Sequence, residues 1–170
     1  MSVPGWLDQT PLHLPAPLRP TPVLAACVQP FSAAELEAAW SEWSGYSPLL
    51  ADVVLVLART GLRWDEARSL TVANAHPERL RVEGTRERCV PVVARIRPIM
   101  ERLLAGRDGE ELLFTTSTGD PLTRRAVLDR LHWDRTGRGR RLVDLRHTAA
   151  HLWLGEGACP EAVREWMGGR

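Results

Sequence analysis

The sequence predicts an α+β fold that is mainly α-helical and contains one small antiparallel sheet. Most of the chain from Ser32 onward shows helical periodicity, beginning with a capping box formed by Ser32 and Glu35. Residues 79–93 instead alternate between apolar and polar positions around Gly84 and Thr85, as a β-hairpin does. The chain has 170 residues, of which 44% are hydrophobic, so it can bury one compact core.

The chain divides into an irregular start and one domain. Residues 1–30 contain seven prolines and little periodicity, so we expect a linker or extended arm there. Residues 31–170 form the predicted domain. Its helices are expected at residues 33–43, 49–59, 63–70, 94–104, 121–132, 144–155 and 160–167. The helix at 49–59 is apolar nearly all round and should be buried, with Gly61 ending it in a left-handed conformation.

The basic residues are unevenly distributed. The formal net charge is only +1, and every basic residue is an arginine. The segment from Asp120 to Ala150 holds eight arginines against four aspartates and therefore carries a formal charge of +4. Such a segment is compatible with a surface that faces phosphates.

Several other classes of site are not expected. Cys27, Cys89 and Cys159 lie far apart in the sequence, so they predict buried thiols rather than a disulfide framework or a zinc site. His147 and His151 have the i, i+4 spacing of metal ligands but no third ligand accompanies them. No apolar run approaches the length of a membrane span, and we expect a cytoplasmic protein without cofactor, metal or small-molecule ligand.

Two short segments suggest chemistry. Thr60-Gly61-Leu62-Arg63-Trp64-Asp65-Glu66 and Asp144-Leu145-Arg146-His147-Thr148-Ala149 each place an arginine at or near the start of a predicted helix, 83 positions apart. A guanidinium can hold two phosphate oxygens at once and keeps its charge at neutral pH. Two of them on one phosphodiester would stabilise the extra negative charge of five-coordinate phosphorus. Glu66 follows Arg63 by three residues and is predicted to hold its guanidinium in place.

These two motifs resemble the two arginine motifs of the tyrosine recombinases, the phage integrase family. The order of the intervening hairpin, helix, Leu113-Phe114 and Gly119–Thr123 agrees, and Val163–Gly168 is similar to a later signature of the family. The resemblance implies the catalytic-domain fold of that family without its usual N-terminal DNA-clamping domain. It also implies that Arg63 and Arg146 clamp a phosphate, that His147 supports Arg146, and that double-stranded DNA is the partner.

The chain departs from the family pattern at four other positions. The hairpin offers Arg86 but no lysine, Val143 replaces a histidine, and Gly169 follows the late glycine where the family has histidine or tryptophan. The sequence stops before the tyrosine segment, and the sole tyrosine, Tyr46, is interpreted as a turn residue. We therefore expect a truncated catalytic domain with a degenerate active site, in which a C-terminal element is missing.

One arginine of the hairpin and several of the basic segment are further candidates for DNA binding. These are Arg86, Arg124, Arg125, Arg138, Arg140 and Arg141. The last three belong to residues 135–141, which are predicted to be a flexible basic loop that follows a DNA backbone, with a solvated loop without a partner as the alternative. For His147 the alternative is a hydrogen-bonded core histidine.

Three functions are compatible with the sequence. The first is an integrase-type DNA recombination protein that is unable to cleave DNA alone. The second is a non-catalytic DNA-binding or regulatory remnant that occupies recombination sites or pairs with an active subunit. In the third, another recombinase subunit supplies the tyrosine in trans, so whether the chain takes part in catalysis is left open.

Overall fold

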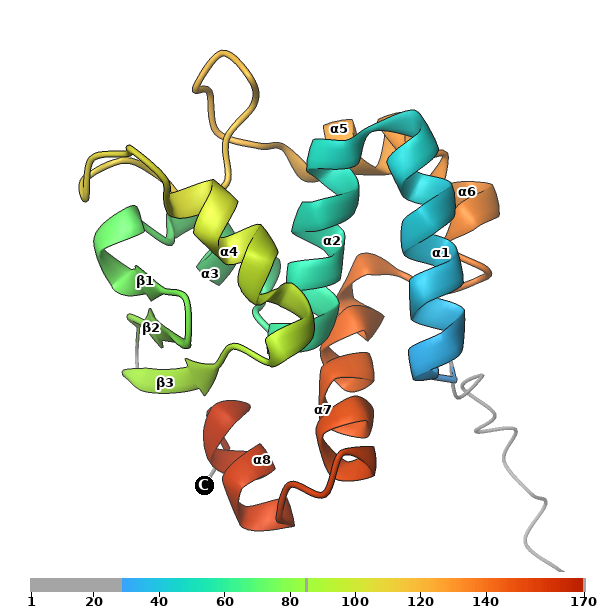
Figure 1. Ribbon diagram of the computed structural model, residues 1–170. Coiled ribbons are helices and arrows are strands. Elements are labelled where there is room, and N and C mark those ends of the chain that lie inside the picture. Colours follow the sequence, from blue (N-terminus) through green and yellow to red (C-terminus); the bar gives the residue numbers. More distant parts are fainter. Residues whose placement is uncertain (1–28, 85, 170) are drawn as a thin grey trace, which may run out of the picture.

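The computed structural model describes residues 29–84 and 86–169 (Figure 1). The predicted Pro-rich arm, apart from its last two residues, lies outside the described residues. The helices are α1 (Ala33–Tyr46), α2 (Pro48–Thr60), α3 (Trp64–Ser69), α4 (Arg97–Leu104), α5 (Arg124–Arg130), α6 (Trp133–Thr136), α7 (Leu145–Gly155) and α8 (Pro160–Trp166). Short 3-10 turns occupy Val72–Asn74, Ala94–Ile96 and Leu142–Asp144. The strands β1 (Ala75–His76), β2 (Arg79–Val82) and β3 (Arg88–Pro91) form one antiparallel sheet, so the predicted fold class is confirmed.

Helix α2 forms the centre of the core. Ser47 accepts a hydrogen bond from the Leu50 amide and Pro48 occupies the first turn, so the helix begins where the sequence predicted. Ten of its thirteen residues are buried, because α1 and α7 pack against it on different sides. A helix that is apolar nearly all round keeps its side chains away from water only when other elements surround it.

Helix α1 begins with the predicted capping box. Ser32 accepts a hydrogen bond from the Glu35 amide at 3.2 Å and donates its own amide to the Glu35 carboxylate at 2.9 Å. Near the other end of the helix, the buried Trp43 stacks on Trp133 of α6 with ring centroids 5.2 Å apart. Trp43, Trp133 and Trp153 are all buried in the core.

The hairpin has the predicted inward face. Leu80 pairs with Val90 in the antiparallel register, and both are buried together with Val82. The turn residue 85 lies outside the described residues. Strand β1 was not predicted, because two residues are too short to show alternation.

The two described cysteines are exposed, so the expectation that they are buried was wrong. Cys89 alternates with the buried Val90 on β3 and therefore points away from the core. Cys159 is the residue that precedes α8, at the surface.

None of the helices in the described ranges is both long enough and apolar enough to cross a membrane.

Gly61 joins the end of α2 to α3 at a crowded point. Its φ of +62° is the left-handed conformation that was predicted for this glycine. A Cβ atom at this position would lie 3.2 Å from both the Ala149 side chain and the Met167 sulfur. Glycine is therefore required at this position for two reasons: the left-handed backbone angle, and the close approach of α7 and of the residue after α8.

Gly61→Ala is expected to lower the free energy of unfolding by more than Gly106→Ala does. Gly106 has a similar φ of +68° but open space around it, so its variant measures the backbone strain alone, about 1–2 kcal/mol. The contacts at Gly61 should add about 1 kcal/mol or more. Urea denaturation of the two variants measures the difference, and equal losses would contradict the crowding at Gly61.

Candidate functional site

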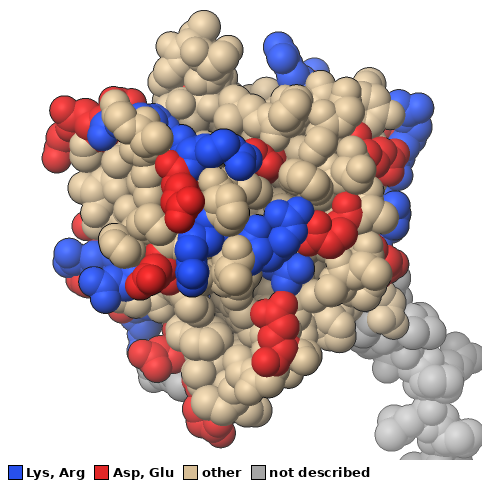
Figure 2. All heavy atoms as spheres, in the orientation of Figure 1, with Lys and Arg blue, Asp and Glu red and all other residues tan. Residues whose placement is uncertain are grey.

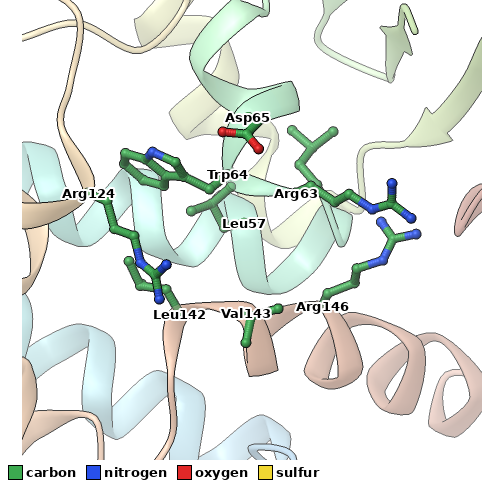
Figure 3. Close-up of a pocket in the computed structure, with 9 residues that line it drawn as sticks. Leu57, Arg63, Trp64, Asp65, Arg124, Leu142, Val143 and Arg146 are labelled. Carbon is green, nitrogen blue, oxygen red and sulfur yellow. The ribbon is translucent and has the colours of Figure 1, made fainter. Parts of the chain in front are cut away.

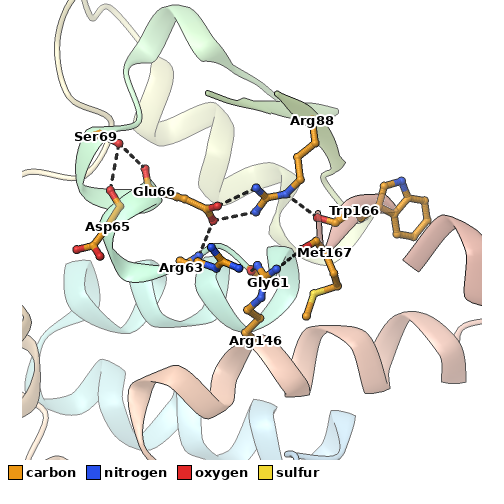
Figure 4. A network of polar contacts seen from close by, with 9 residues as sticks. All are labelled: Gly61, Arg63, Asp65, Glu66, Ser69, Arg88, Arg146, Trp166 and Met167. Carbon is orange, nitrogen blue, oxygen red and sulfur yellow. Dashed lines mark hydrogen bonds and ion pairs between the residues drawn. The ribbon is translucent and has the colours of Figure 1, made fainter. Parts of the chain in front are cut away.

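Arg146 is held against the end of α2 by two backbone carbonyls. It is the second residue of α7, and its guanidinium donates to the Gly61 carbonyl at 2.5 Å and to the Met167 carbonyl after α8 (Figure 4). A guanidinium has five N–H donors, so these two bonds leave three for another acceptor. The contacts fix the side chain of Arg146 at the point where α2, α7 and α8 meet.

Arg63 reaches the same place from a different segment. It is the residue that precedes α3, two positions after the turn at Gly61. Figure 3 shows its guanidinium beside that of Arg146, at one end of a hollow of about 290 Å³ that both residues line. Across the described part of the chain, no hydrogen-bond partner is found for the Arg63 guanidinium. The two arginines that lie 83 positions apart in the sequence thus converge in space, as predicted.

The pKa of Arg146 is lowered by its surroundings. Partial burial is the largest cause, followed by the positive charges of Arg88 and then Arg63, while Glu66 acts in the opposite direction. Two neighbouring cations affect Arg146 in this way only because they are close to it. Arg63, Arg88 and Arg146 thus form a cluster of like charges, the arginine cluster. An added anion would stabilise it.

Glu66 does not hold the Arg63 guanidinium, and that part of the prediction was wrong. Its carboxylate makes a two-pronged ion pair with Arg88, with N–O distances of 2.7 and 2.8 Å, and accepts the backbone amide of Arg63 at 2.8 Å. Glu66 occupies the third position of α3, from which a carboxylate reaches back to the amide before the helix. Its role is to fix the backbone that carries Arg63.

Arg88 is a site residue that the sequence analysis missed. Only 8% of its side chain is exposed, and it also donates to the Trp166 carbonyl at 2.8 Å, so it joins β3, α3 and α8 (Figure 4). One signal was available: Arg88 is two residues before the buried Val90 and shares its face of the strand. A cation on an inward face needs a partner.

The same interactions determine the ionisation of Glu66. Burial alone would raise its pKa, but the hydrogen bonds from Arg88 and the Arg63 amide, together with the charges of Arg88 and Arg146, outweigh burial and lower the pKa. Glu66 therefore stays ionised and neutralises one arginine of the cluster.

A second hollow of about 460 Å³ lies beside the first and shares Arg63 and Asp65 with it. Arg86, Arg88 and Gly84 of the hairpin line it, so the predicted candidate Arg86 lies next to the cluster. The two hollows together are lined by five arginines and three carboxylates, a formal excess of two positive charges. On the face shown in Figure 2, several basic groups lie across the middle among acidic ones.

The other predicted DNA-binding arginines are in different situations. Arg124 lines the first hollow, whereas its neighbour Arg125 points elsewhere and pairs with Asp129 of the same helix. Arg138 lies 3.9 Å from the Glu42 carboxylate, and Arg141 pairs with Asp144. Arg124 is thus the one of these four that adjoins the cluster.

Only 8% of the Arg140 side chain is exposed, which the sequence did not predict. Its guanidinium lies 3.9 Å from the centre of the Phe31 ring and donates to the carbonyls of Gln29 and Pro30. The stretch that was expected to be a flexible loop begins inside α6 and is attached through Arg140 to the start of the domain. Cation–π attraction and backbone acceptors already satisfy this side chain.

His147 is exposed, so the alternative of a core histidine was wrong. Its expected support of Arg146 stays a prediction, since no hydrogen bond to its ring is found in the described ranges. No group of three potential metal-binding side chains occurs in those ranges either.

The sequence profile of the phage integrase family matches residues 36–169. The chain belongs to the phage integrase family. Comparison with curated proteins finds no match.

Solved structures of recombinases share the fold. The Tn1549 transposon integrase in complex with circular intermediate DNA has 21% sequence identity and a TM-score of 0.67, with 82% of this chain and 57% of that chain covered. The XerA recombinase has 15% identity and a TM-score of 0.65, with coverages of 82% and 55%. The catalytic domain of bacteriophage HP1 integrase has 21% identity and a TM-score of 0.62, with coverages of 82% and 79%. The chain thus spans little more than half of the first two.

The structure places Val143 and the sole tyrosine of this phage integrase family member relative to the arginines. Val143 lines the first hollow with 54% of its surface exposed, so an apolar side chain stands there where the resemblance implies a histidine. Tyr46 ends α1 and packs edge-on against His132. The thirteen residues of α2 separate it from Gly61, a length of about 20 Å. Tyr46 therefore does not reach the arginine cluster.

Glu66→Gln is expected to destabilise the protein by about 3 kcal/mol at neutral pH, because it leaves Arg88 buried without its charged partner. A carboxyl group with a lowered pKa stabilises the fold above its unfolded-state pKa and loses this effect as the pH falls through the folded-state value. The difference between wild type and variant should therefore shrink in acid.

Denaturant unfolding at neutral and acidic pH measures this effect. Glu87→Gln is the matched control, because the Arg81–Glu87 pair in the same hairpin has 55% and 58% of its side chains exposed, so solvent screens it and its loss should change the stability little. If the two variants lose equal stability, the Glu66–Arg88 pair does not hold the site together.

Proposed function

We propose that this chain binds duplex DNA as an integrase-type recombination protein, with Arg63 and Arg146 on one phosphodiester. The observation that carries the proposal is the convergence of these two guanidiniums at the end of α2. Both have N–H donors to spare, and they line a hollow that is open to a ligand. A phosphodiester presents two non-bridging oxygens and a negative charge, which matches this arrangement.

The electrostatics of the cluster support the same ligand. Arg88 is neutralised by Glu66 and anchored by the Trp166 carbonyl, so it positions the site, whereas Arg63 and Arg146 keep their charge for the ligand. Such guanidiniums contribute affinity to any phosphate, independent of base sequence. Arg86 and Arg124, on either side, would contact neighbouring phosphates.

Membership of the phage integrase family and the solved structures support DNA as the partner. The Tn1549 integrase structure is a complex with DNA, and a structure of XerH site-specific recombinase bound to its difH substrate also shares the fold, with a TM-score of 0.61. These similarities extend to the elements that carry both arginines, because the family match covers residues 36–169.

We do not expect this chain alone to cleave DNA. The family reaction requires a tyrosine that attacks phosphorus, and Tyr46 lies at the opposite end of α2 from the cluster. Val143 cannot transfer a proton. These two observations favour the second candidate function, in which the chain occupies recombination sites or pairs with an active subunit.

Arg63→Gln is expected to weaken duplex binding about tenfold at moderate salt and to reduce the slope of log K against log salt concentration by about 1. Arg63 is exposed, so the variant should fold. Fluorescence anisotropy with a labelled duplex at several salt concentrations measures both quantities.

Arg102→Gln is the matched control. Arg102 lies on α4, pairs with Asp52 and lines neither hollow, so its loss should change the affinity by less than about threefold. Equal effects of the two variants, or an affinity that does not depend on salt, would contradict a phosphate clamp at Arg63.

A nicked duplex that traps covalent intermediates tests the expectation about cleavage. Incubated with this chain alone, it should yield no covalent complex on a denaturing gel. A Tyr46-dependent adduct would overturn the assignment of Tyr46 as a packing residue.

A further inference from the structure

The first hollow has a cation at each end and an apolar middle. Figure 3 shows Arg124 on the side of the hollow opposite to Arg63 and Arg146. Val143 lies between them and the indole of Trp64 lies beside Arg124, and neither residue is buried. Helices α3, α5 and α7 and the turn before α7 supply these side chains, so several rigid elements set the positions around the hollow.

The charge of this hollow exceeds what one phosphodiester neutralises. Three arginines and one carboxylate, Asp65, line it, which leaves a formal charge of +2. A phosphate on the Arg63–Arg146 pair accounts for one negative charge. The remaining positive charge is at Arg124, across the apolar surface.

Arg124 is positioned to face the hollow. It is the first residue of α5, and the start of that helix is fixed because the Thr123 hydroxyl accepts a hydrogen bond from the Ala126 amide at 3.1 Å. Its neighbour Arg125 is diverted to Asp129 on the outer surface of the same helix. No ion pair to Arg124 is found within residues 29–84 and 86–169.

We infer that this hollow is a subsite for one deoxyribonucleotide unit of a DNA strand, an inference that rests on the proposed function. The phosphate on one side of the sugar is bound by Arg63 and Arg146, and the next phosphate of the same strand is bound by Arg124. The C–H surface of the sugar lies against Val143 and the indole of Trp64. Phosphates and the apolar faces of sugars alternate along a DNA strand, and cationic and apolar side chains alternate in the same way along this hollow.

The subsite explains why an apolar side chain is exposed at Val143. The valine side chain cannot form hydrogen bonds with the arginines around the hollow. A ligand could cover the 54% of its surface that is exposed. A sugar covers apolar surface without requiring a hydrogen bond from it. Val143 and Arg124 thus act as positioning residues that fix which nucleotide lies next to the clamped phosphate.

A small probe that contains one such unit tests the subsite. Thymidine 3′,5′-bisphosphate places a phosphate on each side of one sugar, whereas thymidine 5′-diphosphate carries two phosphates on the same side. Isothermal titration of the full chain should give at least about fivefold tighter binding of the 3′,5′-bisphosphate. Arg124→Gln should abolish this preference, and Arg125→Gln, which removes the same charge from the adjacent position, should preserve it.

Val143→Glu provides an independent readout with duplex DNA. The side chain is exposed, so the fold should tolerate the change, while the new carboxylate would lie between the two phosphates and weaken duplex binding about tenfold. Val143→Thr keeps the shape without the charge and should bind within about twofold of wild type.

The outcomes separate the subsite from the proposed function. Two results together would contradict the subsite: the wild type shows no preference for the 3′,5′-bisphosphate, and Arg124→Gln and Arg125→Gln weaken duplex binding equally. If the wild type still binds duplex DNA through Arg63, the phosphate clamp of the proposed function stands. If the wild type binds neither probe nor duplex, the proposed function fails together with the subsite.

Discussion

Arg146 donates to the carbonyls of Gly61 and Met167, and this pair of hydrogen bonds brings a charged side chain to the place where α2, α7 and α8 meet. Arg63 and Arg88 reach the same place, and three guanidiniums repel one another unless their charges are compensated. Glu66 compensates one of them, and backbone carbonyls stabilise two without removing any charge. The cluster therefore retains positive charge in the absence of a ligand, and an anion between Arg63 and Arg146 lowers its energy. A protein surface that binds phosphate requires this condition.

The rest of the fold maintains this arrangement. Most of helix α2 is buried, and it ends at a glycine whose conformation allows α7 and the end of α8 to approach closely. The hairpin contributes Arg88 from its inward face, and Glu66 connects it to the backbone of Arg63. Because each arginine is anchored through a different element, the site depends on the packing of α3, α7, α8 and the sheet against one another. Stability and binding are coupled at this point of the chain.

The sequence predicted the helices with caps and the two arginines, because hydrogen bonds at helix ends and apolar periodicity are local properties. It did not predict the partners of charged side chains. Glu66 shares a helical face with Arg63 but turns to Arg88, and this choice depends on the register of a hairpin far along the chain. Arg140 belongs to a basic stretch, yet the ring of Phe31 and two carbonyls at the start of the domain bind it. The partners of Glu66 and of Arg140 both come from segments that are distant in the sequence. A local sequence pattern therefore cannot predict them.

A crystal structure of the full chain with a short DNA duplex tests the central claim most directly. We expect one phosphate to lie within about 3 Å of the guanidinium nitrogens of both Arg63 and Arg146, with the Gly61 and Met167 carbonyls still bound to Arg146. A bound duplex whose phosphates contact other arginines and leave this pair in solvent would contradict the account.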